Sequence, residues 1–271
     1  MVSVWLGLFA LVPIVLVFIC SFLNHNDQSF FIWDFTFKNY TQLFNGIYLK
    51  ILLRSLELAV SCTLLCLLIG YPAAFMLARL RSRYKPLLML LLMIPFWTSS
   101  LIRSYAILAL LKTKGLLNLF LLSLGIIHQP LEILYTNSAV LIGCVYNLLP
   151  FMVLPLYANI EKLDNNLLDA AQDLGAGRFK TFKDVIIPLT IPGIMAGTLL
   201  VFLPSITLFY IPTILGGAKS LLLGNLIENQ FMMMQNWPGG SATSMALTAL
   251  MIPLIWMYQH FATKGQQQVL L

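Results

Sequence analysis

The chain has 271 residues, of which 59% are hydrophobic and only 10% charged, and its formal net charge is +6, with a mean hydropathy of +0.87. A soluble domain typically carries about 25% charged residues, so this composition excludes a soluble globular protein and predicts an all-α integral membrane protein. In a membrane protein, basic residues mainly mark the loops on the cytoplasmic side. The positive net charge therefore gives no reason to expect a nucleic-acid partner.

Six apolar segments are long enough to cross the hydrocarbon core of the lipid bilayer, which takes about 20 helical residues. The first segment has no basic leader and no small-residue cleavage site before Asn24, so we expect a retained membrane helix and not a signal peptide. We expect one transmembrane domain over 1–271. Its spans, in chain order, are predicted at about 4–23, 51–78, 86–111, 138–160, 188–211 and 242–261.

Prolines occur in nearly every predicted span. Each one removes a backbone hydrogen bond that lipid cannot replace, which favours helices that line a transport pathway. Proline is also common in membrane helices in general, so this pattern alone leaves both interpretations open.

Basic residues set the expected topology. The densest basic cluster is the loop 79–85, and the loop 161–187 has further lysines and an arginine. The other loops have fewer basic residues for their length. By the positive-inside rule, both termini and the loop 161–187 are expected on the cytoplasmic side.

The segment 161–187, here called the polar knob, is the most polar part of a very apolar chain. Asn166 is a candidate N-cap and Gly175 suits the residue just past a helix end, so we expect a short helix over 167–174. Small residues around Gly175 would let another surface approach closely. A docking element and a plain soluble connector both fit this pattern. One face of the helix is expected to hold Leu163, Leu167, Ala171 and Leu174.

The polar knob resembles the signature loop of ABC-importer permeases, through Asp169-Ala170-Ala171, then Gly175, then Val185, Ile187 and Pro188. In that family the loop forms a coupling helix that sits in a cleft of the ATPase subunit. The family's usual first residue is Glu, and Asp169 keeps that charge on a shorter side chain. The resemblance implies a type I importer permease fold. It also implies coupling contacts from Asp169, Ala170, Ala171, Leu174, Gly175 and Ala176.

Four further segments, at 94–106, 113–118, 148–164 and 215–231, resemble the permeases of spermidine/putrescine importers, and among these the B-type subunit. This resemblance runs from about Asn39 to the last predicted span. It implies polyamine transport across the bacterial inner membrane, with a second related permease, an ATPase pair and a periplasmic binding protein as partners. The chain shows no catalytic triad, Walker loop or metal-ligand set, so ATP and Mg²⁺ are expected on the ATPase subunit and no cofactor on this chain.

A polyamine pathway needs carboxylates and aromatic faces that attract ammonium groups. Glu57 is the one acid well inside a predicted span. It lies about 6 residues from the outer end of its span and Arg103 about 8 from that of the next, a difference in depth of roughly 3 Å. Glu57 is therefore expected either to pair with Arg103 or to serve the pathway. Further pathway candidates within the spans are Trp97, Ser100, Tyr105, Tyr146 and Tyr210.

Two alternatives stay open. A permease of the same family could take a different small solute, and for an anion Arg103 would be a ligand. An ion-driven secondary transporter would need no ATPase, but a single buried acid makes a poor proton relay.

Overall fold

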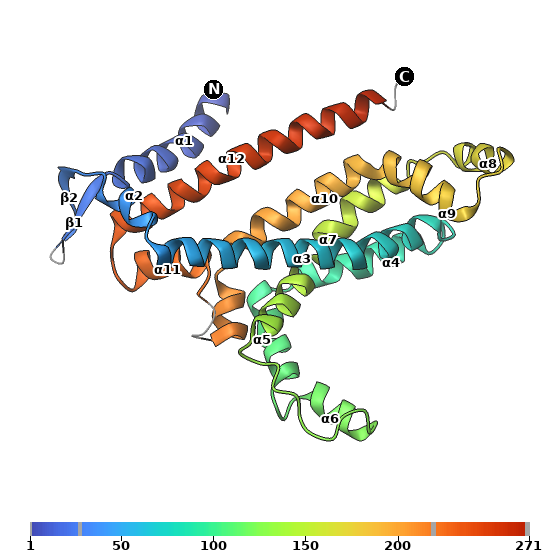
Figure 1. Ribbon diagram of the computed structural model, residues 1–271, viewed down its shortest axis with the longest axis horizontal. Coiled ribbons are helices and arrows are strands. Elements are labelled where there is room, and N and C mark those ends of the chain that lie inside the picture. Colours follow the sequence, from blue (N-terminus) through green and yellow to red (C-terminus); the bar gives the residue numbers. More distant parts are fainter. Residues whose placement is uncertain (1, 27–28, 218–220, 269–271) are drawn as a thin grey trace.

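The computed structural model describes residues 2–26, 29–217 and 221–268, and most of its long helices align along one axis (Figure 1). The longest are α3 (Gly46–Arg79), α7 (Asn137–Ile160), α10 (Ile187–Thr207) and α12 (Trp237–Gln268). Within the described part of the chain, five helical stretches are long and apolar enough to cross a membrane. They are Gly46–Arg79, Ser100–Ser123, Asn137–Ile160, Arg178–Thr207 and Trp237–Trp256. Gly7–Cys20 and Lys85–Trp97 are shorter apolar helices. The helical membrane class is confirmed, and the number of six spans stays a prediction.

The core lies where α3, α7 and α10 pack on one another. α7 is its centre: it runs unbroken through Pro150 and Pro155, and Met152 and Leu156 are fully buried. Glycine lets α10 approach α7 closely, because a Cβ at Gly197 would lie 2.6 Å from the Met152 Sδ and 3.1 Å from its carbonyl oxygen. Membrane helices depend on such close packing, since lipid tails provide no hydrophobic driving force between them.

The predicted span 86–111 is interrupted and not one continuous helix. α4 (Lys85–Met93) leads into a 3-10 turn, η1 (Ile94–Trp97), and α5 (Ser100–Leu111) begins after an extended residue. Pro95 explains the break, because it has no N–H to donate and its ring crowds the preceding turn. Thr98 closes the turn by donating its N–H (3.3 Å) and its hydroxyl (2.8 Å) to the Pro95 carbonyl.

After α5 the chain enters α6 (Leu116–Ser123), and α5 and α6 together form an arm that projects from the bundle (Figure 1). Asn118 holds this arm together. Its buried side-chain amide donates to the carbonyls of Lys112 (3.3 Å), Thr113 (3.2 Å) and Leu131 (2.9 Å), and its oxygen accepts the Leu131 N–H at 2.9 Å. A single side chain therefore ties the loops on both sides of α6 to each other.

A two-stranded antiparallel hairpin lies at the end of the bundle away from the polar knob (Figure 1). The elements here are α1 (Val2–Cys20), β1 (Leu23–Asn26), β2 (Ser29–Phe35) and α2 (Lys38–Leu43). The Asn39 side chain donates to the carbonyls of Ser21 (3.0 Å) and Leu23 (2.9 Å) and so fastens α2 to the base of the hairpin. The hairpin is a small exception in an otherwise helical fold. α12 is the main packing partner of α1.

Two short elements connect α10 to α12: a π-helical turn, η3 (Pro212–Gly216), and α11 (Leu223–Met232). The Asn225 amide donates to the Phe209 carbonyl at 2.8 Å and to the Thr213 hydroxyl at 2.7 Å, which joins α11 to the start of η3. The first N–H of α11, on Leu223, donates to the Ser55 hydroxyl of α3 at 2.8 Å. These bonds fix α11 to η3 and to α3.

Candidate functional site

The polar knob contains the short helix that the sequence predicts, α8 (Asn165–Asp173). Its start differs from the prediction, because Asn166 is not the cap. Instead the Asp164 carboxylate accepts the Asn166 N–H at 3.0 Å, a bond that satisfies one of the free donors at the helix start. The predicted end is confirmed: Gly175 has φ +81°, and the Ala176 N–H donates to the Ala171 carbonyl at 3.0 Å.

α8 turns apolar side chains toward solvent. Leu168 anchors the helix and is 8% exposed, whereas Leu174 is 88% and Leu167 50% exposed. Leu167, Ala170 and Leu174 are spaced at i, i+3 and i+7, so they lie on one face. Asp169 is exposed beside them, and Ala171 and Ala176 are half-buried. The knob thus presents a narrow apolar stripe next to an acidic residue, flanked by small residues.

The knob is joined firmly to the bundle. After α9 (Arg178–Thr181), a π-helical turn, η2 (Phe182–Ile186), runs directly into α10. The Phe182 ring packs edge-on against Tyr71 (5.8 Å between centroids) and Phe75 (6.3 Å) of α3. The Tyr71 hydroxyl forms a 3.0 Å hydrogen bond with Thr190 of α10. A displacement of the knob therefore acts on both α3 and α10.

An ion pair closes the same end of the bundle. The Lys85 ammonium at the start of α4 donates to the Glu161 carboxylate, just past α7, at 3.2 Å. Hydrogen bonds from the Tyr157 hydroxyl and from Lys85 lower the pKa of the Glu161 carboxyl below its ordinary value of 4.5. Both partners reach solvent, so the pair contributes little to stability. Its main effect is to hold the start of α4 beside the end of α7.

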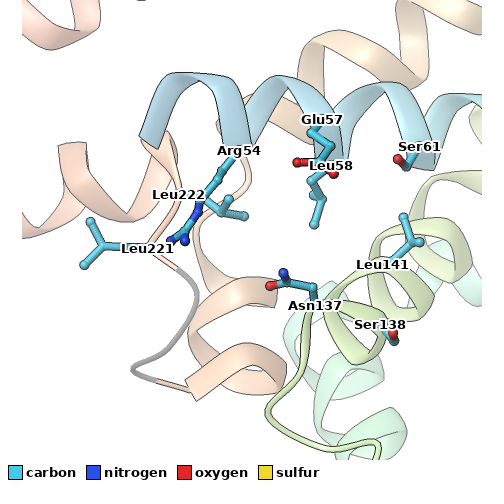
Figure 2. A pocket seen from close by; sticks show the side chains of 9 residues that line it. All are labelled: Arg54, Glu57, Leu58, Ser61, Asn137, Ser138, Leu141, Leu221 and Leu222. Atoms are coloured by element: carbon cyan, nitrogen blue, oxygen red, sulfur yellow. The ribbon is translucent and has the colours of Figure 1, made fainter. Parts of the chain in front are cut away.

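Glu57 lines an open pocket of about 270 Å³ between α3 and α7 (Figure 2). Arg54 lies one turn before Glu57 on the α3 wall, and Asn137 and Ser138 face them from the start of α7. Ser61 and four leucine side chains complete the lining: Leu58, Leu141, Leu221 and Leu222. The pocket therefore combines one carboxylate, one guanidinium and neutral polar groups with apolar sides.

The predicted ion pair between Glu57 and Arg103 is absent: no salt bridge joins these two described residues. Arg103 is held elsewhere, with its guanidinium 5.7 Å from the centre of the Phe96 ring. Equal depth does not bring the two helices together, because α5 packs mainly on α6, α7 and η3 and not on α3. Arg54 and Glu57 are not within ion-pair distance either.

The other predicted pathway residues lie outside the Glu57 pocket. Trp97 is 80% exposed, and Tyr105 and Tyr146 are also exposed on the surface of the chain. Ser100 and Tyr210 are half-buried, and Tyr210 packs edge-on against Phe209 at 5.9 Å. Sequence reasoning missed the polar residues opposite Glu57, although Asn137 and Ser138 could be found as a polar pair that opens an apolar span.

Comparison with known sequences gives a family and two close relatives. Residues 67–264 match the family described as binding-protein-dependent transport system inner membrane component. The spermidine/putrescine transport system permease protein PotB of Haemophilus influenzae is 52% identical over 254 residues, which cover 94% of this chain and 89% of that protein. The protein of the same name from Escherichia coli (strain K12) is also 52% identical, with 94% and 92% covered.

A chain in the crystal structure of a bacterial alginate ABC transporter, in complex with an alginate pentasaccharide-bound periplasmic protein, has a similar fold. The TM-score is 0.77, and the match covers 97% of this chain and 91% of the other. Because only 14% of residues are identical, this likeness concerns the fold alone.

Proposed function

Because the chain belongs to the family of binding-protein-dependent transport system inner membrane components, we propose that it is the permease subunit of an ATP-driven polyamine importer. The cargo class rests on one observation, the 52% identity over 94% of the chain to permeases named for spermidine/putrescine transport. The partners would be a second related permease, a pair of ATPase subunits and a periplasmic binding protein.

The proposal includes six spans and cytoplasmic termini. α1 would be the first span, and α4, η1 and α5 would together make the interrupted third. The basic loop 79–85, the polar knob and the C-terminal end of α12 lie toward the same end of the bundle (Figure 1). Their location together supports a cytoplasmic assignment for this end.

The polar knob would be the contact with the ATPase. A solvent-exposed leucine stripe on a polar segment is a surface that a partner protein can bury. Leu167, Ala170 and Leu174 would enter a cleft of the ATPase, and Asp169 would meet a basic or N–H donor group at its edge. ATP-driven closure of the ATPase pair would move the knob, and the joint at Phe182 would pass that movement to α3 and α10.

The Glu57 pocket would be one stage of the translocation pathway. Its carboxylate suits an ammonium group, the oxygens of Asn137 and Ser138 suit further N–H donors, and the leucine walls suit methylene groups. Trp97, Tyr105 and Tyr146 are exposed on the isolated chain, where they would line the pathway or meet the second permease. Ser100 and Tyr210 would lie behind these aromatic side chains.

The coupling contact is tested by replacing Leu174→Asp and measuring how much ATPase co-purifies with the assembled permeases. The variant lacks the exposed leucine and places a charge in an apolar contact. Most of the ATPase should therefore fail to co-purify. Met233→Asp is the matched control, because Met233 is similarly exposed but lies at the opposite end of the bundle. Equal ATPase recovery from both variants would contradict a coupling role for α8.

The cargo is tested in proteoliposomes that contain the complete complex. Uptake of labelled spermidine and putrescine should require both ATP and the loaded binding protein, and a proton ionophore should not abolish it. An ion-driven transporter gives the opposite result, with uptake that survives deletion of the ATPase and stops with the ionophore. Replacing Trp97→Leu should lower uptake while the ATPase remains bound.

A further inference from the structure

Arg103 has an unsatisfied guanidinium in an apolar setting. Its Nε and Nη1 are buried and have no hydrogen-bond partner. The guanidinium lies over Phe96, whose ring packs edge-on against Phe151 of α7 at 5.0 Å. A ring face attracts the positive charge but does not accept these N–H groups in ordinary hydrogen bonds. A cation within an apolar helix is costly unless it finds an anionic partner.

The guanidinium is still accessible at one atom. Nη2 is not among the buried atoms without a partner, and the Arg103 side chain makes no hydrogen bond within the described residues, so Nη2 reaches the surface of the chain. Three large apolar or aromatic residues near Arg103 along the chain are also exposed: Trp97, Ile102 and Tyr105. These residues belong to η1 and to the arm that projects from the bundle (Figure 1).

Besides a partner subunit, two sources could supply the missing anion: a carboxylate of this chain or a lipid phosphate. Within the described part of this chain no carboxylate pairs with Arg103, and Glu57 lies across the bundle on α3. A lipid phosphate is disfavoured, because the side chain bends back over Phe96, toward the middle of the stretch 85–111 and away from its ends. The polyamine of the proposed function is itself a cation and would be repelled.

We propose that Arg103 is an inter-subunit ion-pair site that receives a carboxylate from a membrane-spanning segment of the second permease. The partner acid would bind Nη2, and a small rotation of the guanidinium would bring Nη1 to the same carboxylate. The exposed aromatic residues around Arg103 would be covered by the same interface. This inference rests on the proposed function only in requiring a second permease subunit.

The geometry predicts that removing the charge of Arg103 has opposite effects on the isolated chain and on the complex. Arg103→Gln removes an unpaired charge from the isolated chain, so that chain alone should accumulate in the membrane at least as well as the wild type. In the complex the same change leaves the partner's acid unpaired, and retention of this chain on a tagged second permease should fall by roughly tenfold or more.

The experiment compares Arg103→Gln, Arg103→Lys and Lys112→Gln. Lys112 is exposed at the end of α5, so its variant should match the wild type. Arg103→Lys keeps the charge and should retain more of the complex than Arg103→Gln. Arg103→Glu should be rescued when one particular Asp or Glu in the spans of the second permease is changed to Arg.

Several outcomes would overturn the inference. One is a complex that Arg103→Gln leaves at wild-type strength, and another is an isolated Arg103→Gln chain that fails to accumulate. A raised KM for polyamine uptake with the complex intact would place Arg103 in a cargo site, and loss that added phosphatidylglycerol reverses would indicate a lipid site. A wild-type complex that assembles but imports no polyamine would contradict the proposed function, while the retention comparison could still be made.

Discussion

Replacing Gly175→Ala tests whether the exact end of α8 matters for coupling. Gly175 has φ +81°, and a Cβ added there meets no atom within 4 Å, so the cost of alanine comes from the backbone alone. An L-residue in the left-handed region costs about 1–2 kcal/mol, which corresponds to a roughly five- to thirtyfold loss of the native helix end. Gly175→Asn should be milder, because asparagine adopts this conformation more easily.

Gly177→Ala is a matched control two residues away. Gly177 has φ −66° and ψ 161°, and its added Cβ also meets nothing within 4 Å, so alanine fits there without strain. The assay is ATP hydrolysis by the reconstituted complex, with and without the loaded binding protein. Stimulation should fall several-fold for Gly175→Ala and stay normal for Gly177→Ala. If the two variants behave alike, the ordered end of α8 is not part of the coupling contact.

Two more predictions concern stability, measured as the thermal unfolding midpoint in detergent. The Tyr157 hydroxyl and Lys85 lower the pKa of the Glu161 carboxyl, so its stabilising effect is present above pH 4.5 and is lost as the pH falls through the lowered pKa. Glu161→Gln should therefore lower the midpoint slightly at pH 7, and the difference from the wild type should shrink as the pH is lowered below 4.5; a difference that does not shrink would contradict this. Gly197→Ala should destabilise the protein by about 1–3 kcal/mol, because its Cβ would overlap Met152 across the contact between α7 and α10. An unchanged midpoint would mean that the two helices can separate without cost.

Local patterns in the sequence predicted local structure well. Gly175 was expected to end a helix, and it does so because few other residues adopt its positive φ. Prolines were less informative, since Pro95 breaks the third span whereas Pro150 and Pro155 remain inside an unbroken α7. The difference comes from packing: α7 packs extensively on both α3 and α10, whereas η1 has its main contact with α4 and reaches α7 through the ring contact of Phe96 with Phe151.

The relation between Glu57 and Arg103 could not be predicted in the same way. Counting residues gives the depth of a side chain along its helix but neither the direction in which it points nor the helix that it faces. Depth alone therefore suggested a pair, whereas α5 turns Arg103 toward Phe96. The polar side of the Glu57 pocket is formed where α3 lies beside the start of α7. This is a tertiary contact, so the spacing of residues within one helix could not predict it.

The contact between α1 and α12 joins the first helix of the chain to the last. During biosynthesis α1 enters the bilayer long before its main packing partner has left the ribosome. The hairpin also packs on α12. Both amino-terminal elements can therefore complete their packing only after α12 has been synthesised. A nascent chain that stops before Trp237 therefore lacks the helix on which both of these elements pack.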